Sequence, residues 1–196
     1  IRDLVRSRGL GDVYKRQAED LPAQVREEMA DYFQREHQTD CWMRGLSTWD
    51  DDAHRSARVD LQWTGSYPSL PAQAINGLYR IGRGEAALQW LRRISPIALQ
   101  GPLGQAHWVE TVRPPFKGGA YKCAADPTHG ADWVVVSNGA YPAMFIESIF
   151  GVRATLSDGL QWSGRWHSFD PEARLENLHY QGHNYRVTRK GIERLD

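Results

Sequence analysis

The chain has 196 residues, with 24 Lys or Arg, 24 Asp or Glu and a hydrophobic fraction of 41%. This length and apolar content suffice for one domain, or for one domain with a small appendage, around a buried core. No apolar run approaches the roughly 18 residues that span a bilayer. No face rich in Lys and Arg marks a phosphate-binding surface, so we expect neither a membrane nor a nucleic acid as partner.

The first segment, residues 1–17, reads IRDLVRSRGLGDVYKRQ and resembles a translated sequencing-adapter read-through in a metagenomic reading frame. It contains five Lys or Arg and two Asp, so the rest of the chain is mildly acidic. We expect residues 1–17 to be an artefactual, disordered leader. The alternative is an authentic basic arm, whose cations could contact phosphate groups.

Apolar residues recur at helical spacing in three segments between residues 21 and 94. A helix is predicted over residues 21–36, where Pro22 suits a first turn and four apolar side chains recur at helical spacing: Val25, Met29, Tyr32 and Phe33. Polar and aromatic residues with scattered Gly and Pro predict a long structured loop over 41–70. Helices over 71–81 and 85–94, separated by a Gly-Arg-Gly break, predict an antiparallel helical hairpin.

The pattern changes again towards the end of the chain. A Gly- and Pro-rich loop is predicted over 101–123 and a last helix over 142–150. Residues 152–162 and 174–195 then alternate polar and apolar side chains around Asp158–Gly159 and Gly182, which predicts antiparallel strands. We therefore expect a leader (1–17), a helical part (18–150) and a β-rich cap (151–196).

Two stretches carry a resemblance to a known superfamily. Residues 44–93 (RGLSTWDDD to LQWLRR) resemble the aromatic- and acid-lined loop and the next-to-last hairpin of six-hairpin glycosidases. Residues 137–162 (SNGAYPAMFIESIFGVRATLSDGLQW) resemble their last toroid helix and the Asp-Gly turn of their C-terminal β-domain. The superfamily includes bacterial rhamnosidases, glucoamylases, trehalases, processing α-glucosidases and related disaccharide phosphorylases.

The resemblance implies a mostly α fold with a β cap. The chain would be an incomplete (α/α)6 toroid of helical hairpins followed by a small antiparallel β-domain. Its partners would be the missing N-terminal toroid hairpins of its own chain and an oligosaccharide or glycoside substrate. The implied activity is that of an inverting glycoside hydrolase, in which one carboxylic acid protonates the leaving oxygen and a carboxylate activates water. Only this general base would lie here.

We assign the general base to Glu110, on the loop after the hairpin, where the resemblance places it. Gln105, His107 and Trp108 precede it and supply an amide, a hydrogen-bond donor and a ring on which a sugar could stack. The alternative is that Glu110 is a surface carboxylate and His107 a structural donor.

The chain is rich in aromatic residues, with eight Trp and eight Tyr. Sugars pack their C–H faces on flat rings and bind planar polar groups through their hydroxyls, although a Trp can equally be a core residue. The residues expected to bind substrate are Trp49, Asp50, Arg58, Asp60, Trp63, Gln105, His107, Trp108, Lys122 and Trp133.

Two features leave alternatives open. Asp51 and Asp52 suit solvated or helix-capping positions better than a calcium site, because the run lacks the D-x-D-x-D-G pattern. Gly118–Gly119 is either a flexible turn or a nest for an anionic group, with Lys117 or Lys122 as counter-charge.

No motif implies a metal or a cofactor, and we expect neither. Cys41 and Cys123 form no metal-binding pattern, although a single disulfide is possible, and the compartment stays open. Two other functions compete with hydrolysis. They are a non-catalytic carbohydrate-binding or interaction module built on the β-rich tail, and a disaccharide phosphorylase.

Overall fold

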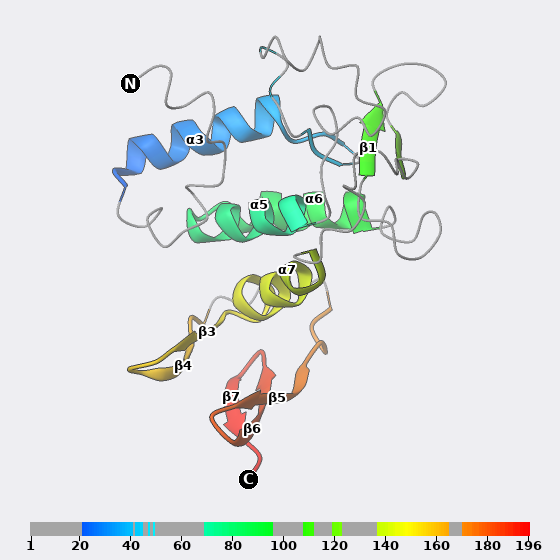
Figure 1. Ribbon diagram of the computed structural model, residues 1–196. Helices are drawn as coiled ribbons and strands as arrows, with labels where there is room; N and C mark the ends of the chain where they lie inside the picture. Colours follow the sequence, from blue (N-terminus) through cyan, green and yellow to red (C-terminus); the bar gives the residue numbers. More distant parts are fainter. Residues whose placement is uncertain are drawn as a thin grey trace. The chain divides into compact units, whose positions relative to one another are not determined.

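The computed structural model describes residues 21–40, 42–44, 47, 49, 69–95, 137–164 and 170–196, and the backbone of strands 108–111 and 119–122 (Figure 1). The predicted leader and most of the predicted loop residues lie outside these ranges. The chain divides into two compact units, which we call unit 1 (Ile1–Ala140) and unit 2 (Tyr141–Asp196).

Three helices form most of the described part of unit 1 (Figure 1). They are α3 (Ala23–Glu36), α5 (Ser69–Arg80) and α6 (Gly84–Ile94). Their ends agree with the predicted helices to within two residues. Between α5 and α6, Gly82 adopts a φ of +89°, the left-handed conformation that favours glycine and ends a helix. The two helices pack on each other, as the predicted helical hairpin requires.

The described core of unit 1 joins α3 to α6 through aromatic rings. Phe33 meets Trp90 edge to face with ring centroids 5.5 Å apart. The indole N–H of Trp90 donates a hydrogen bond of 3.0 Å to the main-chain oxygen of Thr39, so the ring is buried without leaving its donor unpaired. Ile75 and Leu78 of α5 are fully buried as well. Each such side chain contributes about 1.5–3 kcal/mol through burial.

Arg83, in the turn before α6, ties that turn to α3. Its guanidinium donates to the Glu27 carboxylate, pairs with Asp31 at 2.8 Å and donates to Gln34 Oε1 at 2.9 Å. The hydrogen bond with Glu27 is the main reason that the pKa of Arg83 is raised. Because Glu27 and Asp31 are about half exposed, the pairs together contribute only about 1 kcal/mol.

The last helix changes its hydrogen-bonding pattern along its length. It begins as α7 (Ser137–Met144) and continues as the π-helix η3 (Phe145–Ile149), where a helix over 142–150 was predicted. Pro142 lies inside α7 and has no N–H to donate. The N–H of Phe150 donates to the carbonyl of Phe145, five residues back, at 2.9 Å. The helix ends with this wider turn, and two residues, Phe150 and Gly151, separate it from the first strand of unit 2.

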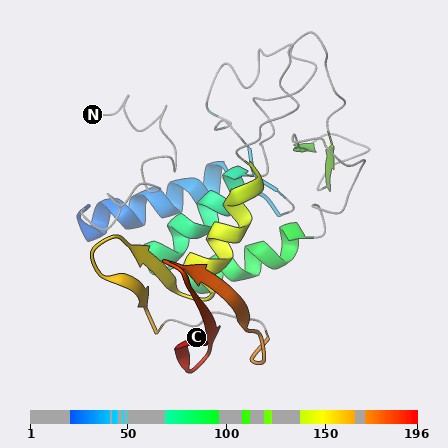
Figure 2. The ribbon, with the colours of Figure 1, turned by 60° about the horizontal axis from the view of Figure 1, so that its bottom comes forward.

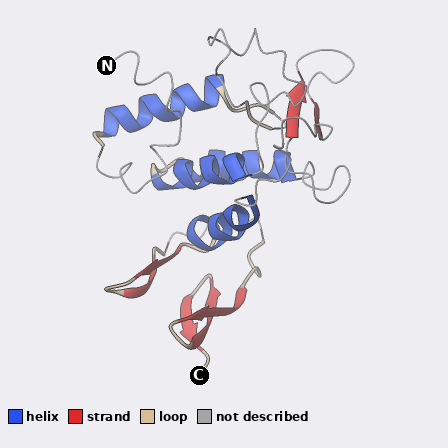
Figure 3. Cartoon of the chain, viewed as in Figure 1, coloured by secondary structure: helices blue, strands red, loops and turns tan. Residues whose placement is uncertain are grey.

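Five strands in the described part of unit 2 form two antiparallel sheets (Figures 2 and 3). Strand β3 (Val152–Thr155) pairs with β4 (Gly159–Trp162). The second sheet has the order β5-β6-β7, from strands β5 (Leu175–Tyr180), β6 (His183–Thr188) and β7 (Gly191–Arg194). Antiparallel strands are thus found where the alternating sequence predicts them, over 152–162 and 174–195.

The turns of unit 2 contain the residues that the sequence pointed to. Gln181 and Gly182 have φ values of 48° and 83°, and two consecutive positive φ values are typical of the type I′ turn of a two-residue hairpin. In the β3–β4 hairpin the N–H of Asp158 donates to Thr155 Oγ1 at 2.9 Å, and Gly159 has a φ of +71°. These turns determine which residues face each other across the strands.

A further hairpin lies in unit 1, where the sequence predicts only a loop. Strand β1 (Trp108–Thr111) runs antiparallel to β2 (Gly119–Lys122). The prediction of a loop over 101–123 is therefore wrong for these two segments. Each contains only four residues, and the Gly and Pro residues that surround them obscured the short strand pattern.

The predicted fold class, mostly α with an incomplete (α/α)6 toroid, is wrong. In the described residues only α5 and α6 form a helical hairpin, while α3 is followed by a turn and α7–η3 by strand β3. A toroid helix must bury a broad surface between neighbours. In contrast, α3 buries only the narrow stripe of Ala30, Phe33 and Glu36. The missing toroid hairpins expected as partners depended on this architecture and lose their support with it.

Candidate functional site

The structure describes the side chain of only one of the residues that the sequence assigned to the site. This residue is Trp49. Trp108, Glu110 and Lys122 lie in β1 and β2, whose backbone alone is described. The other seven candidates lie outside the described residues: Asp50, Arg58, Asp60, Trp63, Gln105, His107 and Trp133. The candidate site is therefore built around Trp49.

Trp49 presents an exposed ring that is nevertheless held in place. The residue is 82% exposed. Its indole Nε1–H donates a hydrogen bond of 3.2 Å to Glu36 Oε1, and its main-chain N–H donates one of 3.1 Å to Ser47 Oγ. A tryptophan left in water exposes a large apolar surface. These two bonds fix both its backbone and the polar edge of its ring, so the apolar faces of the ring are oriented before any ligand arrives.

Glu36 is the buried acceptor that holds this arrangement together. The residue is 4% exposed, although a carboxylate is rarely buried without partners. Ser47 Oγ donates to its Oε2 at 3.1 Å, and Arg35 Nε donates to its Oε1 at 2.9 Å. With Trp49, three different side chains thus donate to one carboxylate. Glu36 thus brings the exposed side chains of Arg35 and Trp49 together with the buried Ser47 at the C-terminal end of α3.

Glu36 is not among the site residues predicted from the sequence, although its position in the helix carries a signal. Glu36 follows Phe33 by three residues and Met29 by seven, so it continues the apolar stripe of the predicted helix. A carboxylate in such a register must find donors when it is buried. Serine and tryptophan residues follow it within thirteen positions and supply them.

A tight turn after α3 leads the chain back towards the site. The N–H of Trp42 donates to Thr39 Oγ1 at 2.9 Å, and an isolated antiparallel bridge links Gln38 to Met43. Beyond this bridge, the N–H of Arg44 donates to the carbonyl of His37 at 2.9 Å. The chain between Arg44 and Trp49 therefore starts from a fixed position beside the end of α3.

His37 supports this turn as a neutral side chain. Its ring stacks on Phe33 with centroids 6.2 Å apart. Its Nδ1 lies 3.2 Å from the carbonyl oxygen of Arg44, which can only accept, so Nδ1 carries the hydrogen. Burial lowers the pKa of His37, and this effect outweighs the hydrogen bond with Arg44 and the charge of Glu36, which act to raise it. His37 is thus a structural donor near neutral pH.

The β1–β2 hairpin brings three predicted residues onto one short element. Its register pairs Trp108 with Lys122 and Glu110 with Ala120. Trp108 and Glu110 are separated by a single residue on β1, whereas Lys122 is more than ten positions away in sequence. The hairpin therefore places the candidate base, one candidate stacking residue and one candidate cation along one four-residue pairing.

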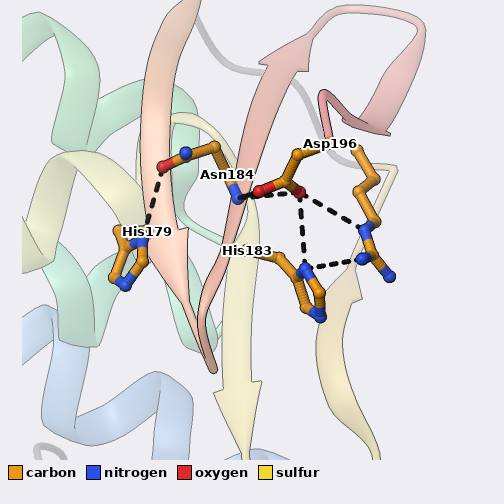
Figure 4. Close-up of polar contacts among 5 residues, drawn as sticks. His179, His183, Asn184 and Asp196 are labelled. Atoms are coloured by element: carbon orange, nitrogen blue, oxygen red, sulfur yellow. Dashed lines mark hydrogen bonds and ion pairs between the residues drawn. The ribbon is translucent and has the colours of Figure 1, made fainter.

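A second polar cluster lies in unit 2, at one end of the three-stranded sheet (Figure 4). Asp196 accepts the main-chain N–H of Asn184 at 3.3 Å and Arg194 Nε at 3.4 Å. Desolvation acts to raise the pKa of Asp196, but these hydrogen bonds outweigh it, so the pKa lies below its usual value. His183 Nδ1 lies 2.6 Å from Arg194 Nη2 and 3.4 Å from Asp196. The cluster ties the segment after β7 to β6, and we assign it a structural role.

No helix in the described ranges is long and apolar enough to cross a membrane. Within those ranges, no group of three His, Cys, Asp or Glu side chains could hold a metal ion. No protein-family model and no curated protein matches the chain. The candidate site is therefore defined by the geometry of its own residues.

Proposed function

We propose that the chain binds an oligosaccharide or glycoside through Trp49 and acts as part of a glycoside hydrolase. The observation that carries the binding proposal is the 82% exposed indole of Trp49, whose Nε1–H is tethered to the buried carboxylate of Glu36. Aromatic platforms for sugars require an apolar face that is open to solvent. A platform that is already oriented loses less conformational entropy on binding.

The neighbourhood of Trp49 also supplies polar groups of the kind that sugar hydroxyls need. Arg35 donates to the same oxygen of Glu36 as Trp49 does, and its side chain is 66% exposed. A guanidinium provides five N–H donors in one plane, so donors remain after the bond to Glu36. A stacking face beside planar donors is the combination that suits the C–H faces and the hydroxyls of a sugar.

The β-rich tail, which was the alternative binding module, offers less support for sugar binding. The hydroxyl of Tyr180 donates to the carbonyl of Thr155 at 2.7 Å. The Nε1 atom of Trp162 is buried, and its ring lies beside Gly191. In the described part of residues 151–196, no aromatic side chain is exposed to the extent of Trp49. We therefore place sugar binding in unit 1.

Binding is tested with the full chain against a panel of neutral and charged oligosaccharides, by calorimetry or affinity electrophoresis. Trp49→Ala should weaken binding about tenfold or more, because it removes the stacking face. Trp49→Phe keeps a ring but loses the tether, so its affinity should be intermediate. Leu156→Ala is the matched control, since Leu156 is 99% exposed in unit 2. Binding that Trp49→Ala leaves unchanged would contradict the proposal.

The hydrolytic part of the proposal assigns the general base to Glu110. Its support is the placement of Glu110 beside Trp108 on β1, with Lys122 opposite Trp108. Inversion requires a second carboxylic group at roughly 6.5–9.5 Å, for which the described residues give no assignment. Because general-base catalysis contributes about 10² to 10⁴, Glu110→Gln should lower the turnover of aryl glycosides by at least 100-fold.

The control for this variant is Glu172→Gln, an exposed carboxylate in unit 2. Turnover that Glu110→Gln leaves near the wild-type rate would exclude Glu110 as the base. Cleavage that requires inorganic phosphate, and releases a sugar phosphate, would instead identify the reaction as that of a phosphorylase. Neither measurement tests the binding role of Trp49, which the binding experiment above tests separately.

A further inference from the structure

We infer that the Trp49 surface selects acidic glycans, in which a carboxylate or sulfate group lies beside the sugar ring that stacks on Trp49. This inference rests on the proposed carbohydrate binding and adds the chemical class of the sugar. Its basis is the position of Arg35. Arg35 Nε and Trp49 Nε1 both donate to Glu36 Oε1, at 2.9 and 3.2 Å. Arg35 Nε and Trp49 Nε1 therefore cannot be farther apart than the sum of these two distances, so the guanidinium and the indole edge are neighbours.

The orientation of Arg35 leaves its binding edge open. Its Nε is bonded to Glu36, and its guanidinium carbon lies 5.7 Å from the centre of the Tyr32 ring. Among the described residues, no contact engages Nη1 or Nη2 of Arg35. These two nitrogens carry the parallel N–H groups that bind a carboxylate or sulfate in a bidentate manner. A fixed guanidinium with this edge open is suited to an anionic group.

The charges around the surface favour the same class of ligand. Among the described residues, Glu36 is the anion in contact with both Arg35 and Trp49, but only 5% of its side chain is exposed and its oxygens already accept three donors. Arg44 adds a second cation to the same turn, where its main chain pairs with His37. Asp40 is the one exposed carboxylate in the described part of residues 35–49. In the described part of residues 35–49, the cations Arg35, which is exposed, and Arg44, which is half-buried, thus stand against the single exposed carboxylate of Asp40.

The test compares ligands that differ only in charge. Oligogalacturonate and its methyl ester share the same ring, and a sulfated oligosaccharide and its desulfated form distinguish sulfate from carboxylate recognition. We expect the wild-type chain to bind at least one anionic form about tenfold more tightly than its neutral partner. The preference should decrease as salt is raised, because the groups involved are exposed.

Variants of Arg35 assign the preference to this residue. Arg35→Gln should abolish the preference, so that the acidic ligand binds no more tightly than its methyl ester, and methyl-ester binding that still depends on Trp49 shows that the surface is intact. Arg35→Lys keeps the charge but loses the bidentate edge, so it should retain only part of the preference. Arg93→Gln, at an exposed position near the end of α6, is the control and should retain all of it.

Two results would overturn the inference in distinguishable ways. Equal, Trp49-dependent binding of the acidic and neutral forms would leave carbohydrate binding intact and refute the selection of acidic sugars. A preference for acidic forms that Arg35→Gln does not alter would also refute it, because the anion would then bind elsewhere. Absence of binding to all ligands would refute the proposed carbohydrate binding itself.

Discussion

Replacing Glu36 by Ala removes the acceptor on which the Trp49 surface depends, and the structure allows its cost to be worked out. The buried bond from Ser47 involves a charged group, so its loss costs about 1.5–2 kcal/mol. The tether of Trp49 is partly exposed and adds about 1 kcal/mol. The pair with Arg35, which is 66% exposed, adds less than about 0.5 kcal/mol. Together these terms predict a loss of about 3 kcal/mol.

A loss of this size should be visible by thermal and urea denaturation. For a chain of about 200 residues it corresponds to a decrease in Tm of about 6–12 °C. The affinity of the Trp49 surface should fall about fivefold as well, because the free ring must then be ordered by the ligand. Glu36→Gln keeps the volume and one acceptor oxygen, so about half of the destabilisation should remain.

The matched control is Glu28→Ala, on the same helix. Glu28 is exposed and accepts a single exposed hydrogen bond from Gln24, so its loss should cost only about 0.3 kcal/mol. A decrease in Tm for Glu36→Ala that is no larger than the decrease for Glu28→Ala would contradict this role of Glu36. The same conclusion would follow if Glu36→Ala unfolded the chain partially but left the fluorescence of Trp49 unchanged.

Two further predictions concern stability alone. Because burial lowers the pKa of His37 below the ordinary value of a histidine, about 6.5, the unfolded chain binds a proton there at higher pH than the folded chain does. The free energy of unfolding should therefore decrease as pH falls below about 6.5, which urea denaturation at pH 7, 6 and 5 can measure. This decrease should be smaller in His37→Phe than in the wild type. In the control variant His179→Gln it should equal that of the wild type. Gly82→Ala should lower the free energy of unfolding by about 1 kcal/mol, because Gly82 has a φ of +89°. Gly139→Ala should raise it by about 0.5 kcal/mol, because Gly139 lies inside α7 with open space around it. Equal effects of the two glycine variants would contradict this prediction.

The elements that the sequence predicted well are those whose signal is local. The helices before and after Gly82 follow from their apolar spacing, and the β5–β6 hairpin follows from Gly182 between alternating residues. Their ends were displaced by at most two residues. Helix 142–150 was placed too late, because Pro142 suggested a first turn although it lies inside α7.

The global arrangement could not be obtained in this way. An order of helices, loops and strands is compatible with many folds, so the toroid inferred from it had no support from packing. Within the site, Trp49 was predicted from its type and its polar neighbours, and it is exposed as a stacking residue requires. Glu36 was missed because a carboxylate in a helix is expected in solvent. Its donors Ser47 and Trp49 come from beyond the turn, and such contacts leave no periodic pattern.

The strand pairing of unit 2 has a consequence for how the chain acquires its structure. Each described pair joins strands that are neighbours in sequence, and the turns at Leu156–Asp158, Gln181–Gly182 and Arg189–Lys190 are only two or three residues long. Closing such short loops costs little entropy, and single hairpins form in about 1–10 μs. The β3–β4 ladder can thus form by itself, and β7 can add to the edge of the β5–β6 hairpin, without any search for a distant strand.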